Sequence, residues 1–64
     1  MNMEFSIKAI RINAGLTQEQ VAEILGITQR AYSDKENGVQ KFYFTEVKKI
    51  CSVTNFPISQ VKDC

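Results

Sequence analysis

The segment TQRAYSDKENG, residues 28–38, gathers polar side chains that form hydrogen bonds in well-defined directions. A helical step of about 100° per residue places five of them within one outward arc of about 140°. These five are Gln29, Arg30, Ser33, Asp34 and Asn37. The amide of Gln29 and the guanidinium of Arg30 are planar, and each can form two parallel hydrogen bonds with one planar partner. The arc is therefore a candidate recognition surface, although every surface helix also has a solvated polar face.

Other kinds of site chemistry have little support in the sequence. The chain has no histidine, the commonest general base, and no Gly-rich phosphate loop. Its cysteines, Cys51 and Cys64, lack the spacing of a zinc site. The run DKENG fails as a calcium loop, because the positions that need glycine and glutamate hold Val39 and Thr45. We therefore predict no enzyme, no metal, no cofactor and no small-molecule substrate. Cys51 is expected to be a small buried residue and Cys64 an exposed free thiol.

The elements that would position the arc are helices, because apolar residues recur at intervals of three and four between turn residues. A first helix over about residues 4–14 places Ile7, Ile10 and Ala14 on one stripe. Gly15 can end this helix in the left-handed conformation.

Two short helices follow, and both have clear start signals. Thr17 and Gln20 match a capping box, which predicts a second helix that Gly26 ends. Its inner face holds Val21, Ala22 and Leu25. A third helix is expected from its cap at Thr28 to about Asn37.

The C-terminal part predicts two more helices beyond a connector at residues 39–43. The longer one runs from about Phe44 to Thr54. Its inward residues are expected to be Val47, Ile50, Cys51 and Thr54. Pro57 can occupy the first turn of a short fifth helix, with Ile58 and Val61 closing the core.

The composition fits one small domain. With 64 residues, 44% of them hydrophobic, and a single proline, the chain is expected to form one compact fold over residues 1–64. No apolar run approaches the roughly 20 residues of a membrane span, so we predict no membrane association and a cytoplasmic location. The net charge is only +1, so any argument for a polyanionic partner depends on how the charges are distributed.

A short helix, a turn containing Gly26 and a second short helix are typical of a helix-turn-helix unit, here at about residues 17–37. Small Ala22 stands where the two helices would cross. The residues expected to be buried between them are Val21, Leu25, Ile27 and Tyr32, and Lys35 alone breaks the apolar pattern. Two sequence signals stand at a characteristic separation: Arg11 followed by GLTQEQVA at residues 15–22, and ENG at residues 36–38. In these signals the chain resembles the lambda-repressor-like, xenobiotic-response-element (XRE) type of helix-turn-helix transcriptional regulators, which includes phage repressors and Cro proteins. The resemblance covers nearly the whole chain and implies an all-α, compact five-helix domain.

The resemblance also implies sequence-specific binding of double-stranded DNA, with the third helix in the major groove. The implied base-reading residues are Gln29, Arg30, Ser33 and Asp34. The implied phosphate contacts are Gln18, Thr28, Asn37, Gly38 and Lys41, although Gln18 can also be read as an ordinary first-turn residue. Arg11 and Glu36 would form a structural ion pair that locks the reading helix to the scaffold.

Two residues depart from the family pattern. Asp34 should face the groove, where the phosphate potential opposes a carboxylate. It could accept a hydrogen bond from cytosine N4, or pair with Arg30 one turn earlier. Lys35 is expected to lay its stem over the core while its ammonium reaches water.

The expected assembly is a homodimer on a palindromic operator with half-sites about 34 Å apart. The resemblance implies a role as a phage or mobile-element repressor, or as an antitoxin-like autoregulator. The candidate dimer interface comprises Phe42, Tyr43, Phe44, Phe56 and Ile58. A satellite cluster packed on the fourth helix explains the aromatic residues equally well. The rival function is a protein-binding module with little DNA affinity, which Asp34, the sparse basic residues and the aromatic triplet at residues 42–44 favour.

Overall fold

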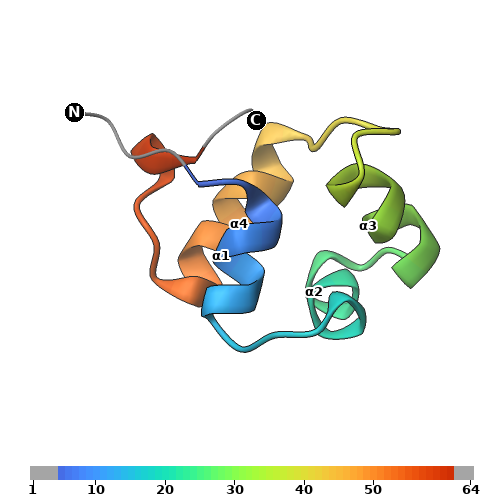
Figure 1. Ribbon diagram of the computed structural model, residues 1–64, viewed down its shortest axis with the longest axis horizontal. Helices are drawn as coiled ribbons and strands as arrows, with labels where there is room; N and C mark the ends of the chain where they lie inside the picture. Colours follow the sequence, from blue (N-terminus) through green and yellow to red (C-terminus); the bar gives the residue numbers. More distant parts are fainter. Residues whose placement is uncertain (1–4, 62–64) are drawn as a thin grey trace.

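The computed structural model describes residues 5–61, which form four α-helices and a short 3₁₀ turn (Figure 1). The elements are α1 (Ile7–Asn13), α2 (Gln18–Leu25), α3 (Gln29–Glu36), α4 (Phe44–Thr54) and the 3₁₀ turn η1 (Ile58–Gln60). The expectation of an all-α fold is confirmed, but that of a fifth α-helix is not. The backbone is extended at Pro57 and again at Val61, which leaves room for a single turn between them. Cys64 lies outside the described residues.

The first helix begins later than the sequence predicts, because Phe5 is held in extended backbone. Phe5 forms a parallel β-bridge with Val61, so the segment before α1 is anchored to the other end of the described chain. Ser6 then caps α1, and its Oγ accepts a hydrogen bond of 3.1 Å from Ala9 N. Ala14 is the C-cap and is exposed, so it does not belong to the inner stripe.

The central helices start and stop where their caps predict. Thr17 Oγ1 accepts from Gln20 N at 3.1 Å, and Gln20 Oε1 accepts from Thr17 N at 2.8 Å, which completes the capping box of α2. Gly26 ends α2 with φ 73°, a left-handed conformation that costs glycine little. Thr28 caps α3 by accepting from Ala31 N at 3.1 Å. This turn therefore fixes where α3 begins relative to α2.

The core lies where α1, α2, α3 and α4 meet, and α2 packs against both α3 and α4. Figure 1 shows α1 beside α4, with α2 and α3 toward the other end of the molecule. The buried apolar residues are Ile7, Ile10, Val21, Ala22, Tyr32, Val47, Ile50, Cys51 and Val61. Val61 closes the core as expected, whereas Ile58 is 36% exposed because the single turn of η1 leaves its side chain outward. None of the helices within residues 5–61 is long and apolar enough to span a membrane.

Candidate nucleic-acid interface

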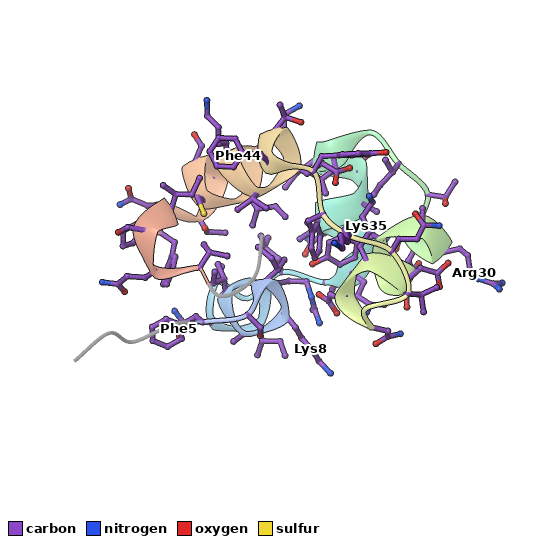
Figure 2. The ribbon with its side chains drawn as sticks, turned by 90° about the horizontal axis from the view of Figure 1, so that it is seen from above. Phe5, Lys8, Arg30, Lys35 and Phe44 are labelled. Carbon is purple, nitrogen blue, oxygen red and sulfur yellow. The ribbon has the colours of Figure 1, made fainter. Side chains whose placement is uncertain are left out.

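Helix α3 presents its N-terminal polar side chains to solvent. Gln29 and Arg30 are exposed, and Figure 2 shows Arg30 extending away from the rest of the molecule. Tyr32, on the opposite side of the helix, is completely buried. The helix therefore has one anchored face and one accessible face, and the accessible face carries two side chains suited to bidentate hydrogen bonds.

The C-terminal half of this surface is partly engaged with its own helix and the connector. Asn37 Nδ2 lies 3.4 Å from Ser33 Oγ. The backbone carbonyl of Asp34 accepts hydrogen bonds from Val39 N and Gln40 N, at 2.8 and 3.2 Å. Within residues 5–61, no ion pair joins the Asp34 carboxylate to another residue, so the pairing with Arg30 is not formed in the free chain. The Asp34 side chain is half-buried.

Glu36 is the acceptor at the centre of a cluster that joins α1, α2 and α3. Its side chain is 1% exposed, and Oε2 lies 2.6 Å from Arg11 Nε. Tyr32 Oη donates to Glu36 Oε2 at 2.6 Å, and Gln18 Nε2 donates to Oε1 at 2.9 Å. Arg11 Nη1 also donates to the carbonyl of Leu16 at 2.8 Å, which ties the α1–α2 loop to the same guanidinium. The cluster holds α3 in place by its final turn.

The charge states in this cluster follow from burial and hydrogen bonding. Burial raises the pKa of the Glu36 carboxyl, but hydrogen bonds from Arg11, Tyr32 and Gln18 outweigh it, and the pKa lies below its ordinary value. The hydrogen bond to Glu36 raises the pKa of Arg11. Burial, and then the hydrogen bond to Glu36, raises the pKa of Tyr32. At neutral pH the cluster therefore contains a carboxylate, a guanidinium and a neutral phenol.

A pH dependence of stability follows from the lowered pKa of Glu36. Such a group stabilises the fold fully above its unfolded pKa of about 4.3, and that contribution is lost as the pH falls through the lower folded value. We expect the difference in unfolding free energy between the native chain and Glu36→Gln to shrink as the pH falls below about 4. Denaturant titrations of both chains at a series of pH values measure this difference, and the other carboxylates cancel because both chains carry them. A difference that grows on acidification would contradict the assigned direction.

Sequence reasoning did not find two members of this cluster. It placed Gln18 at a phosphate and Tyr32 in the core, without linking either to Glu36. A signal was available for Tyr32, because a residue four positions earlier on the same helix lies beside Glu36. Gln18 gave no comparable signal, since its approach to Glu36 depends on how α2 crosses α3.

Lys35 differs most from its expected position. Its ammonium does not reach water: Lys35 is 8% exposed, and Figure 2 places it inside the molecule. Nζ lies 3.2 Å from Glu46 Oε1 and donates to the carbonyl of Lys41 at 3.1 Å. It also lies 4.7 Å from the centroid of the Tyr43 ring. The expectation fails because α4 places a carboxylate within reach of the ammonium inside the fold.

The aromatic triplet is divided between the core and the surface. Phe42 is half-buried, and its ring meets that of Tyr32 edge-on with centroids 5.9 Å apart. Tyr43 and Phe44 are 69% and 60% exposed. Lys48 Nζ lies 5.7 Å from the centroid of the Phe44 ring. One aromatic residue therefore packs against the core, and the next two are largely accessible.

The other two residues of the candidate dimer interface divide in the same way. Phe56 is half-buried, and its ring meets that of Phe5 edge-on at 5.4 Å. Ile58 is among the exposed apolar residues. The exposed members of the candidate interface are thus Tyr43, Phe44 and Ile58.

The remaining predicted contact residues lie near the ends of α3. Thr28 is exposed, although its hydroxyl is used as the N-cap. Asn37, Gly38 and Lys41 are exposed after the last turn of α3. Gly38 has φ 82°, which ends the helix and starts the connector. These positions lie at the two ends of α3.

Comparison with known protein families identifies the same helix-turn-helix motif. A helix-turn-helix family model matches residues 7–61, from the start of α1 to the residue that closes the core. No curated protein matches the chain significantly. The matched range contains both helices of the motif, the Arg11–Glu36 contact and α4. The chain therefore belongs to the lambda-repressor-like, XRE-type family of helix-turn-helix DNA-binding regulators.

Proposed function

We propose that this chain is a single-domain transcriptional regulator that binds double-stranded DNA in a sequence-specific manner with α3 in the major groove. The observation that carries the proposal is the division of α3 into two faces. Tyr32 and Glu36 anchor the inner face, while Gln29 and Arg30 are exposed on the outer one. A helix held this firmly can present fixed hydrogen-bonding directions to base edges.

Each outward residue has a base to which its chemistry is suited. Gln29 can pair bidentately with adenine, and Arg30 with guanine O6 and N7. Ser33 can donate or accept, and Asp34 can accept from cytosine N4. Because Asp34 has no ion pair with Arg30 in residues 5–61, the cytosine role is the one we favour.

The proposed phosphate contacts are Gln18, Thr28, Asn37, Gly38 and Lys41. Gln18 can contact a DNA phosphate while it remains hydrogen-bonded to Glu36. One N–H of its amide donates to Glu36, and the amide has a second N–H that can donate to a phosphate oxygen. Lys41 is exposed in the connector that follows α3 and provides a positive charge there.

We further propose a homodimer on a palindromic operator. A domain with a net charge of +1 gains little from non-specific attraction, so two copies on two half-sites would provide the affinity. The exposed residues Tyr43, Phe44 and Ile58 support an apolar contact between copies, and the proposed interface also includes the half-buried Phe42 and Phe56.

A second candidate function is a protein-binding module with little affinity for DNA. The exposed rings of Tyr43 and Phe44 and the carboxylate of Asp34 favour it. The two functions differ in their salt dependence, because phosphate contacts release counterions and contacts with a protein mostly do not.

Selection from a random duplex library, followed by titration of the winning sequence at several salt concentrations, tests the proposal. We expect a palindromic site to be enriched and its affinity to fall steeply with salt. If no sequence is enriched at low salt, the regulator proposal fails and the protein-binding alternative stands.

Asp34→Asn is expected to raise affinity for random-sequence DNA, most strongly at low salt, because it removes a negative charge from the groove-facing side of α3, where the phosphate potential opposes it. The measurement is a titration of native and variant chains with a duplex that lacks the selected site. Ser52→Lys is the matched control, since it makes the same change in net charge at an exposed position of α4. A fall in non-specific affinity for Asp34→Asn would contradict the proposed orientation of this carboxylate.

A further inference from the structure

Lys35 occupies a position on the inner face of α3 where an apolar side chain would pack. Its side chain is 6% exposed, and taking an ammonium out of water is unfavourable unless its donors are satisfied. A leucine or methionine would fill the same space without that penalty. The charge at this position therefore calls for an explanation beyond packing.

The ammonium is enclosed by three groups from the segment that follows α3. These groups are the carboxylate of Glu46, the backbone carbonyl of Lys41 and the ring face of Tyr43. The carbonyl of Lys41 accepts a hydrogen bond from the ammonium, the carboxylate of Glu46 forms an ion pair with it, and the ring offers a cation–π contact. Lys35 thus links the last turn of α3 to both the connector and the start of α4.

Glu46 connects this link to the cap of α4. The oxygen that lies 3.2 Å from Lys35 Nζ, Oε1, also accepts a hydrogen bond of 2.9 Å from Tyr43 N. The backbone amide of Tyr43, the N-cap residue of α4, and the ammonium of Lys35 therefore share one acceptor atom. A shift of the connector away from α3 would break the contacts of Lys35 with the Lys41 carbonyl and with the Tyr43 ring.

We propose that Lys35 is a positioning residue for phosphate binding: it holds the connector against α3 so that Lys41 meets the DNA backbone. This inference rests on the proposed function. The backbone of Lys41 is held by Lys35 while its own side chain is exposed. The first part of the connector is already tied to α3 by the amides of Val39 and Gln40. Lys35 extends that attachment to the residue that carries the charge.

The double variant Lys35→Met/Glu46→Gln tests the proposal. Methionine fills the space of the lysine stem, and glutamine can still accept from Tyr43 N, so the capping box survives. The two changes leave the net charge unaltered and leave no buried charge unpaired. Lys8→Met, at an exposed position of α1 that Figure 2 shows pointing away from the molecule, is the control for the loss of a lysine.

The first measurement needs no DNA. We expect backbone ¹⁵N relaxation and amide exchange at residues 39–43 to show greater mobility in the double variant than in the native chain or in Lys8→Met. Unchanged order at these residues would overturn the inference. If the double variant does not fold, Lys35→Met alone provides the test. It removes both contacts of the ammonium with the connector, and the carboxylate of Glu46, whose side chain is 14% exposed, can still accept from Tyr43 N.

The second measurement is operator binding across a range of salt concentrations. We expect the double variant to lose about one unit of the slope of log K against log salt, as Lys41→Ala should, with base preference unchanged. The effects of the double variant and of Lys41→Ala should not add, because both remove the same contact. The inference would be overturned if the double variant kept the native salt slope and its effect on affinity added fully to that of Lys41→Ala. Failure of the native chain to bind any duplex would instead overturn the proposed function, and the relaxation measurement would still decide whether Lys35 orders the connector.

Discussion

Glu36→Ala is expected to lower the free energy of unfolding by about 3–5 kcal/mol, the cost typical of removing one partner of a buried ion pair. The substitution leaves the Arg11 guanidinium, the Tyr32 hydroxyl and the Gln18 amide without their shared acceptor. A domain of this size has a total stability of roughly 3–10 kcal/mol. The single change therefore removes a large part of the stability, and at the lower end of that range it unfolds the chain.

Urea denaturation followed by circular dichroism measures this effect, with Glu23→Ala as the control. Glu23 is an exposed glutamate on α2, so its removal should change stability by about 0.5 kcal/mol or less. A loss of less than about 1 kcal/mol for Glu36→Ala would show that water replaces the carboxylate, and that the cluster is not the main attachment of α3.

The consequence for DNA binding would be indirect. Arg11 comes from α1, Gln18 from α2, and Tyr32 and Glu36 from α3, so the cluster fixes the recognition helix relative to both preceding helices. Loss of Glu36 should reduce the fraction of chains with α3 in its binding position. Affinity should then fall for every DNA sequence alike, without a change in base preference.

Sequence reasoning succeeded where structure is decided locally. The starts of α2 and α3 follow from Thr17, Gln20 and Thr28, because a cap needs only residues within one turn of it. The late start of α1 could not be predicted in this way. It depends on Phe5 pairing with Val61, at the far end of the described chain.

Inside the site, too, contacts between distant parts of the chain could not be predicted from local sequence patterns. The family resemblance implied the pairing of Arg11 with Glu36, and the two side chains are in contact. For Lys35, the helical period correctly placed the side chain on the inner face, but periodicity carries no information about which group on another helix meets it. Its partner, Glu46, lies on α4, and only the packing of α4 against the rest of the fold brings the two together.

Arg30→Ala should relax the choice of base at one operator position by about 1–3 kcal/mol, a factor of roughly 5 to 150 in affinity for the preferred base. The fold should be unaffected, because Arg30 is exposed and takes part in none of the ion pairs within residues 5–61. The measurement is a set of titrations against operators in which each base pair is changed in turn.

The same titrations should be carried out with Lys41→Ala and Gln29→Ala, so that their effects on base discrimination can be compared with that of Arg30→Ala. A base reader and a phosphate contact leave different signatures, since only the former changes the ranking of sequences. Arg30→Ala should alter discrimination at one position in each half-site and Gln29→Ala at a neighbouring one, whereas Lys41→Ala should weaken binding to all operators equally. If Arg30→Ala behaves as Lys41→Ala is expected to, the guanidinium contacts the DNA backbone. Base recognition by α3 would then have to come from Gln29, Ser33 and Asp34, and the orientation of the helix in the groove would differ from the one proposed.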